Sequence, residues 1–332
     1  MGSGRENDKP TVVLTRRWPE SVEFALEQRY ALVRNENDEA FSADQLVAAL
    51  TEADVVCPTV TDALTAEVFA AASRVGIRAK LLANFGVGYN HIDLASAEAN
   101  GLSITNTPGV LTAATAEIAM TLLLMCARRA GAGERLVRSG DWRGWYPTHM
   151  LSTQVTGKTL GIVGMGRIGT ALARQAHHGF GMRVVYSGRS PVDESTAVEL
   201  EAEHLPLDQL LGVADFVSLH CPATPDTRNL INARTFALMR NEAMLINTAR
   251  GDVVAEDDLI RALQDGVIAG AGLDVYAQEP RVPAELLALE QVVLLPHMGS
   301  GTQETREAMG LCALENIEAH FAKRVLPNAV VQ

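Results

Sequence analysis

Three side chains in the last third of the chain have types that suit proton and anion chemistry. Arg250 and His297 each come just after a predicted strand, and Glu279 lies shortly beyond another. Because ligands bind at the edge where parallel strands end, we expect the three side chains to converge there. Taken singly, they could be a surface cation, a histidine leading into a helix, and a turn residue before Pro280. Their joint placement favours one shared site.

The chemistry that fits these three side chains is reduction of a 2-oxo acid. Hydride transfer to a carbonyl builds negative charge on oxygen, which a nearby acid must protonate. His297 is the candidate proton donor, and Glu279 is the carboxylate that would stabilise its charged form. Arg250 can hold a carboxylate or carbonyl oxygen of the substrate through its planar guanidinium.

A glycine-rich stretch predicts where a dinucleotide would bind. The strand pattern from Leu160 to Val163 runs into Gly164-Met165-Gly166-Arg167-Ile168-Gly169, and a helical pattern follows. Gly164 allows a sharp turn, Gly166 lets the backbone approach a pyrophosphate, and Gly169 lets the helix pack on the strand. The phosphates would lie at the helix N-terminus, where unpaired N–H groups and the helix dipole favour negative charge. A second strand at 183–186 completes a dinucleotide-binding βαβ unit.

The end of that second strand bears on the choice between NAD and NADP. NAD-preferring sites usually place Asp or Glu there, but this chain has no acid before Asp193. Arg189, with Ser187 and Ser190, could bind a 2'-phosphate through charge-assisted hydrogen bonds. We therefore expect NADP to be preferred and NAD to be possible. The alternative is that Arg189 is a solvated loop cation and the site accepts either cofactor.

Length and composition indicate a two-domain globular protein. The chain has 332 residues, 47% of them hydrophobic, and a formal net charge of -12 that makes nucleic acid or an anionic membrane an unexpected partner. Its four cysteines lie far apart without metal-binding spacing, which is typical of buried thiols in a reducing cytoplasm. No apolar run could span a bilayer and the polar start is no signal peptide, so we expect a cytoplasmic protein. Residues 1–9 are expected to be a disordered leader.

Strand and helix patterns alternate along the chain, which predicts parallel sheets with helices on both faces. Expected strands lie at 11–14, 31–34, 55–56, 81–83, 102–105, 160–163, 183–186, 216–219, 244–247, 268–273 and 292–295. Expected helices lie at 19–28, 43–52, 112–129, 207–213, 233–239, 257–264 and 303–323. The helix at 112–129 is apolar nearly all round and must therefore be buried.

Five sequence blocks, in order, resemble the D-2-hydroxyacid dehydrogenase family. They are GIVGMGRIG at 161–169, HCPATPDTRNLI at 220–231, LINTARGDVV at 245–254, AGLDVYAQEP at 271–280 and LLPHMGSGT at 294–302, and the resemblance runs from Thr11 to Leu326. It implies that His297 is the acid, Glu279 its partner and Arg250 the residue that orients the substrate. It also implies that Asp274 holds the nicotinamide carboxamide and that Thr115 lies near the cofactor.

The resemblance implies an α/β fold of two doubly wound parallel-sheet domains. A Rossmann cofactor domain at 109–298 would be inserted in a flavodoxin-like substrate-binding domain formed by 10–108 and 299–332. The substrate domain would close over the cofactor domain, usually in a homodimer. The cofactor contacts that we expect are Thr115, Gly164, Gly166, Arg167, Ile168, Gly169, Ser187, Arg189, Ser190, Cys221, Pro222, Thr227, Thr248, Ala249, Arg250, Asp274, His297 and Gly299.

The loop from Asn84 to Asn90 matches the family's carboxylate-binding loop. Successive backbone N–H groups in a glycine-flanked turn can form a nest for an anion, and we expect the amides of Val87 and Gly88 to do so. The alternative is an ordinary tight turn.

Within the family, the chain is most similar to glyoxylate/hydroxypyruvate reductases. Ser-Gly-Arg at 187–189 and the segment 142–147 carry this narrower resemblance, and in such enzymes a Trp of the partner subunit can reach the pocket. Trp145 or Trp142 could do so, or could simply pack a dimer arm. We therefore expect reduction of a small 2-oxo acid to the D-2-hydroxy acid with NADPH.

Three other activities remain open at the level of sequence. One is an NAD-dependent D-2-hydroxyacid or 3-phosphoglycerate dehydrogenase. Phosphoglycerate is disfavoured because no further regulatory domain follows and the loop around Gly86 is not basic. A formate dehydrogenase is less expected without an extended N-terminal region. A dinucleotide-sensing binding protein would not need Arg250, Glu279 and His297 together.

Overall fold

The computed structural model describes residues 9–331 and divides into two compact units. The first comprises residues up to Leu111 together with those from Thr302 onward, and the second is Thr112–Gly301. These divisions fall three residues beyond the predicted domain boundaries at 108/109 and 298/299. Most of the predicted disordered leader lies outside the described residues. Lys9, its last member, donates hydrogen bonds to the carbonyl oxygens of Glu27 and Gln28.

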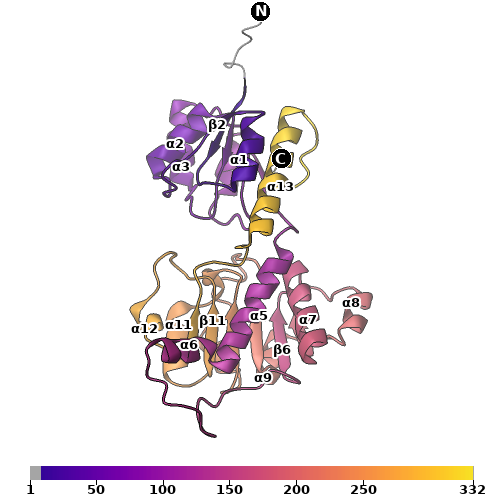
Figure 1. Cartoon of the computed structure of the whole chain (residues 1–332). Helices are drawn as coiled ribbons and strands as arrows, with labels where there is room; N and C mark the ends of the chain where they lie inside the picture. The colour runs from indigo at the N-terminus through magenta and orange to yellow at the C-terminus, as the bar shows by residue number, and fades with distance from the viewer. Residues whose placement is uncertain (1–8, 332) are drawn as a thin grey trace, which may run out of the picture. The chain divides into compact units, whose positions relative to one another are not determined.

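The first unit is a six-stranded sheet in the order β13-β5-β4-β3-β1-β2, parallel except for β13. Its elements are β1 (Thr11–Leu14), α1 (Glu20–Glu27), β2 (Ala31–Val33), α2 (Ala43–Glu52), β3 (Val55–Cys57), α3 (Ala66–Val75), β4 (Leu81–Ala83), α4 (Leu94–Ala99), β5 (Ser103–Thr105), α13 (Gln303–Phe321) and β13 (Ala329–Val331). Helices α2, α3 and α4 share one apolar cluster with inward side chains of the sheet. Figure 1 shows α13, in yellow, beside α1.

Small residues allow α13 to pack closely on α1. A Cβ at Gly310 would lie 2.7 Å from Val22 Cγ1, so only glycine fits between the two helices. Farther along, the rings of Tyr30 and Phe321 lie 5.3 Å apart. Helix α13 thus belongs to the first unit, whose predicted segments included residues 299–332.

The second unit is a seven-stranded parallel sheet in the order β12-β11-β10-β9-β6-β7-β8. Its strands are β6 (Thr159–Val163), β7 (Arg183–Ser187), β8 (Glu203–His204), β9 (Phe216–Leu219), β10 (Met244–Asn247), β11 (Gly270–Leu273) and β12 (Val292–Leu294). Its helices are α5 (Thr112–Arg128), α6 (Ala130–Arg138), α7 (Arg167–Phe180), α8 (Glu194–Glu199), α9 (Leu207–Val213), α10 (Ala233–Phe236), α11 (Glu256–Gln264) and α12 (Ala284–Leu287).

The two faces of this sheet are covered by different helices, as expected for a doubly wound fold. Because strand side chains alternate, Leu160 and Ile162 of β6 pack with α5 and α7, whereas Val163 packs with α9, α10 and α11. The apolar helix at 112–129 is largely buried as α5, and leucine and alanine side chains along it contact the sheet. The strand order reverses between β6 and β9, and in open parallel sheets ligands bind beyond the carboxyl ends of the strands at such a point.

Candidate active site

The structure brings His297 and Glu279 together at the carboxyl edge of the second unit's sheet. His297 Nδ1 lies 2.7 Å from Glu279 Oε2, and each side chain is 30% exposed. The other carboxylate oxygen, Oε1, accepts a hydrogen bond of 3.0 Å from the Tyr276 amide. Burial raises the pKa of Glu279, but the hydrogen bond and the charge of His297, together with the Tyr276 amide, hold it below its ordinary value. Glu279 is therefore a carboxylate at neutral pH.

The backbone at His297 is held in the left-handed region by Asp274. His297 has φ of 53°, which is uncommon for a residue other than glycine. Its amide donates to the Asp274 carbonyl, and the Asp274 side chain accepts from the amides of Met298 at 2.6 Å and Gly299 at 2.8 Å. Burial raises the pKa of Asp274, and these amides partly offset the shift. Asp274 thus fixes the turn that presents the imidazole.

Thr115 ties the long buried helix α5 to the same turn. Its hydroxyl donates a 2.9 Å hydrogen bond to the Gly299 carbonyl. A Cβ at Gly299 would lie 3.3 Å from Asp274 Oδ2, so a larger residue there would crowd the Asp274 carboxylate. The expected cofactor contacts of Thr115, Asp274 and Gly299 stay predictions, but the three residues lie together.

Arg250 follows β10 in a turn held by the side chain of Asn247. Asn247 accepts from the Ala249 amide at 2.9 Å and donates to the Arg250 carbonyl at 2.9 Å. Burial lowers the pKa of Arg250, and the charge of Glu279 acts in the opposite direction. The neighbouring Thr248 hydroxyl is buried and has no hydrogen-bond partner among the described residues. A guanidinium and an unsatisfied hydroxyl therefore follow β10 at the edge where a ligand is expected.

The three motif glycines after β6 have distinct steric surroundings. Gly164 has φ of 92°, and a Cβ there would lie 2.7 Å from the Cys221 nitrogen. A Cβ at Gly169 would lie 2.6 Å from the Gly164 carbonyl oxygen, so the start of α7 packs directly on the turn. At Gly166, the N-cap of α7, a Cβ would meet no described atom within 4 Å. The open space before the N-terminus of a 14-residue helix fits a dinucleotide phosphate.

The remaining cofactor candidates lie at the start of α7 and in the loops after β7 and β9, the strands on either side of β6. The Ser187 carbonyl accepts from the Gly164 amide, which joins the end of β7 to the glycine turn. Arg189 is exposed and forms no ion pair within residues 9–331. Thr227 Oγ1 donates to the Pro222 carbonyl at 2.5 Å and closes the loop after Cys221. Arg167 and Ile168 begin α7, and Ser190 follows in the loop after β7.

The loop with Val87 and Gly88 belongs to the first unit, where it follows β4. The carbonyls of Gly86, Val87 and Gly88 all accept hydrogen bonds from side-chain amides, whereas the amides of Val87 and Gly88 donate none within residues 9–331. The loop therefore has the free N–H groups that an anion nest requires. Its assignment to the substrate carboxylate stays a prediction.

The segment with Trp145 is exposed in the isolated chain. Helix α6 buries none of its residues, and Trp145 beyond it is 80% exposed. Trp142 donates its indole N–H to the Gly144 carbonyl. The single chain gives Trp145 no packing role, and a contact with another subunit stays a prediction.

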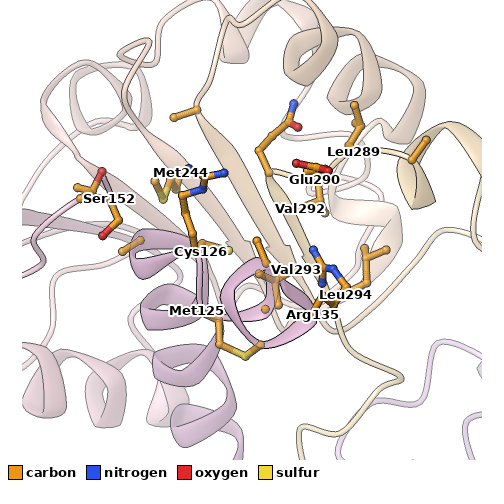
Figure 2. A pocket seen from close by; sticks show the side chains of 18 of the residues that line it. Met125, Cys126, Arg135, Ser152, Met244, Leu289, Glu290, Val292, Val293 and Leu294 are labelled. Atoms are coloured by element: carbon orange, nitrogen blue, oxygen red, sulfur yellow. The ribbon is translucent and has the colours of Figure 1, made fainter. Parts of the chain in front are cut away.

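A pocket of ≈ 680 Å³ lies at the opposite edge of the second unit's sheet (Figure 2). Met244 and Val292, the first residues of β10 and β12, line it together with Cys126 and Arg135 of the helices α5 and α6. Because the catalytic candidates follow the carboxyl ends of the strands, this hollow is separate from their site.

Several residues that shape the site were not assigned from sequence. Tyr276 supports Glu279 through its amide and donates its hydroxyl to the Leu295 carbonyl at 2.8 Å. His220, after β9, hydrogen-bonds the Ser218 hydroxyl, and burial lowers its pKa to about 4. Asn84 begins the loop from Asn84 to Asn90, but its two hydrogen bonds to carbonyls of that loop are seen only in the structure. The spacing of these residues gave no signal of their role.

The free cysteines partly match the expectation of buried thiols. Cys57 and Cys126 are buried, and burial raises the pKa of the Cys126 thiol to about 12. Cys221 and Cys312 are partly exposed, so the expectation is wrong for these two. No helix within residues 9–331 combines the length and apolarity needed to cross a membrane. The cytoplasmic location stays a prediction.

Comparison with known proteins identifies the family. A model described as "D-isomer specific 2-hydroxyacid dehydrogenase, NAD binding domain" matches residues 120–299. The chain belongs to the D-isomer specific 2-hydroxyacid dehydrogenase family. It is 43% identical over 326 residues to a glyoxylate reductase of Thermococcus onnurineus, covering 97% of this chain and 96% of the relative. A glyoxylate reductase of Pyrococcus furiosus is 41% identical, with 97% and 95% covered.

Solved structures support the same membership. The NADPH-dependent glyoxylate/hydroxypyruvate reductase of Sinorhizobium meliloti, in complex with NADP and malonate, superposes with a TM-score of 0.85 at 33% identity and covers 97% of each chain. As a 2-hydroxyacid dehydrogenase, the protein is an oxidoreductase that acts on CH–OH groups with a nicotinamide dinucleotide. The predicted family, fold class and enzyme class are thus confirmed.

Proposed function

We propose that this dehydrogenase reduces glyoxylate, hydroxypyruvate or a similarly small 2-oxo acid to the D-2-hydroxy acid, with NADPH as the preferred reductant. The observation that carries the proposal is the pair of His297 and Glu279, in contact at 2.7 Å on the sheet edge that also ends in the glycine turn. Relatives with 40–43% identity named glyoxylate reductase support the substrate class.

His297 is the proton donor in this proposal. Its Nδ1 faces Glu279, which leaves Nε2 as the ring nitrogen that would protonate the carbonyl oxygen. A bound reduced nicotinamide would supply the hydride. Glu279 stabilises the imidazolium, and Asp274 fixes the turn on which the imidazole stands. Arg250 binds and polarises the substrate's oxygen atoms, and the amides of Val87 and Gly88 bind its carboxylate.

The loop after β7 supports the preference for NADPH. Arg189 is exposed and forms no ion pair within residues 9–331, so its charge is available for a 2'-phosphate. Ser187 and Ser190 provide hydroxyl donors on either side. The relative from Sinorhizobium meliloti, whose structure holds NADP, supports the same cofactor.

We assign the substrate-binding role to residues 10–108 and 299–332 and the cofactor-binding role to 109–298. We also propose a homodimer, because no residue within 9–331 covers the exposed apolar side chains around α6. Val137, Trp142, Trp145, Tyr146 and Leu151 are 50% to 80% exposed. Such a cluster of large apolar residues marks a protein-binding surface. Trp145 is the residue proposed to reach the partner's substrate pocket.

A kinetic panel tests the proposal. Initial rates with NADPH and with NADH, each against glyoxylate, hydroxypyruvate, pyruvate and phosphohydroxypyruvate, give kcat/KM for every pair. The proposal predicts the highest values for glyoxylate or hydroxypyruvate with NADPH. A preference for NADH, or for the phosphorylated acid, would favour the other dehydrogenase activities. Tight NADPH binding without turnover of any acid would favour a dinucleotide sensor.

A further inference from the structure

Three consecutive carbonyl groups in the loop after β4 are engaged by two asparagine side chains. Asn84 Nδ2 donates to the carbonyls of Gly86 at 3.1 Å and Gly88 at 3.0 Å. Asn106 Nδ2 donates to the Val87 carbonyl at 2.9 Å. Asn84 is 1% exposed, so its amide is part of the packed interior of the first unit.

The orientation of the Asn84 amide follows from its partners. Both hydrogens of Nδ2 face carbonyl oxygens, so Oδ1 must be the acceptor on the other side. His91 Nε2 lies 3.0 Å from this Oδ1 and must therefore donate a hydrogen to it. The backbone at Asn84 is also fixed, because its amide donates to the Thr105 carbonyl. Asn84 is thus held from three directions.

The direction of each of these carbonyl groups fixes the direction of the N–H group that follows it in the chain. In a planar trans peptide, the C=O and the next N–H point to opposite sides. Anchoring the carbonyls of Gly86 and Gly88 on Asn84 turns the N–H groups of Val87 and Tyr89 away from Asn84. Anchoring the Val87 carbonyl on Asn106 turns the Gly88 N–H away from Asn106. None of these three amides donates a hydrogen bond within residues 9–331.

We propose that Asn84 and Asn106 are positioning residues that hold three successive amides, those of Val87, Gly88 and Tyr89, ready to bind the carboxylate of the substrate. The inference rests on the proposed 2-oxo acid reductase activity and adds Tyr89 to the two amides assigned above. A preorganised nest binds an anion without the entropy cost of ordering the loop. Asn84 controls two of the three peptide planes, so its loss should matter more than that of Asn106.

The test measures oxalate binding to the full-length, NADPH-saturated protein by calorimetry, together with KM and kcat for glyoxylate. For Asn84→Ala we expect oxalate Kd and glyoxylate KM to rise by about 10-fold or more, as loss of oriented charge-assisted hydrogen bonds implies. Asn106→Ala should give a smaller rise of the same kind. In both variants kcat should change less than KM, and the Kd of NADPH should stay unchanged.

Two further variants distinguish the effect of losing the Asn84 N–H donors from the effect of changing the shape of its side chain. Asn84→Asp keeps the side-chain size but replaces both N–H donors with an acceptor, so oxalate binding should be as weak as in Asn84→Ala. Asn100→Ala is the matched control, because Asn100 Nδ2 donates to the Ser96 carbonyl at 2.8 Å at the end of α4. This control should bind oxalate and NADPH like the parent.

Folded Asn84→Ala protein with parental oxalate affinity would overturn the proposal, as would an equal weakening of NADPH. If Asn84→Ala does not fold, the oxalate affinity of Asn106→Ala serves as the test. Parental oxalate affinity in that variant would contradict the proposal. A parent that binds oxalate but reduces no 2-oxo acid would refute the proposed function while the loop could still be tested. A parent that binds no oxalate would contradict both.

Discussion

Replacing Glu279 with Gln removes the negative charge beside His297 while keeping the shape of the side chain. In the parent, one carboxylate oxygen lies 2.7 Å from His297 Nδ1 and the other accepts from the Tyr276 amide at 3.0 Å. A glutamine has only one oxygen, so its NH2 group must face one of these two N–H donors. If the NH2 group faces the Tyr276 amide, that contact becomes repulsive, and if it faces the imidazole, Nδ1 must lose its hydrogen in order to accept from it. In either orientation the imidazolium loses its counter-charge.

The size of the effect follows from the lost charge-assisted hydrogen bond. Such a bond contributes about 1.5–3 kcal/mol, which corresponds to a decrease in kcat/KM for reduction of about 10- to 100-fold at neutral pH. Because the pKa of Glu279 is held below its ordinary value, its carboxylate stays charged down to acidic pH in the parent. The charge is lost only as the pH falls through that lowered pKa. Glu279 should therefore keep its negative charge beside His297 across neutral pH.

The assay is the pH profile of kcat/KM for glyoxylate reduction with NADPH. In Glu279→Gln, the decline of the rate toward alkaline pH should begin at lower pH than in the parent. Glu256→Gln is a matched control, because Glu256 accepts from the neighbouring Ala277 amide and forms no hydrogen bond or ion pair with His297 within residues 9–331. An unchanged profile in Glu279→Gln, with only a uniform loss of rate equal to that of the control, would refute the reasoning.

Four other substitutions have distinct expected outcomes. Gly166→Ala should keep the parental Tm but raise the Kd of NADPH at least severalfold. Gly169→Ala should lower Tm, because its Cβ would lie 2.6 Å from the Gly164 carbonyl oxygen. The reverse pattern would contradict the placement of the phosphates at Gly166. Arg189→Ala should raise KM for NADPH but not for NADH, and equal effects would remove the phosphate argument. His220→Gln tests a stability effect: because the pKa of His220, about 4, lies below the ordinary 6.5, protonation of this one group should remove about 3 kcal/mol of unfolding free energy as the pH falls from 6.5 to 4, and the variant should lose about that much less than the parent. Chemical denaturation at both pH values measures this difference.

Much of the fold could be predicted because its strands are short apolar runs in regular alternation with helices. The patterns located β1, β4, β9 and β10 with the bounds that the structure shows. The expected strand at 268–273 is shorter, because β11 begins at Gly270. Apolar content marks burial, but it does not mark the residue at which backbone pairing begins.

Several elements of the structure were not predicted from the sequence. Helix α6 buries none of its residues, so its pattern carried no core signal. The last strand, β13, pairs antiparallel with β5 at the edge of the first sheet, and a strand-helix alternation does not predict such a return. Helix α3 was also missed, although Val68, Phe69 and Ala72 form a regular buried face.

At the site, the residues that follow strands could be located but the contacts that orient them could not. His297 and Glu279 were predicted as partners from their types and positions after strands and from the family resemblance, and the structure places them in contact. The support that Asp274 gives the His297 turn depends on a left-handed φ that no sequence pattern specified. Asn84 and Asn106 contact the loop after β4 through its backbone carbonyls. Every residue type has a backbone carbonyl, so the sequence does not indicate these contacts.

The central claim is that His297 donates the proton that completes carbonyl reduction. The most direct test is the single-turnover rate of glyoxylate reduction by His297→Ala, measured by NADPH absorbance at saturating cofactor and substrate. The account predicts a rate lower by about 100-fold or more, as loss of a general acid implies, with NADPH affinity close to that of the parent. A His297→Ala variant that reduces glyoxylate at the parental rate would contradict it.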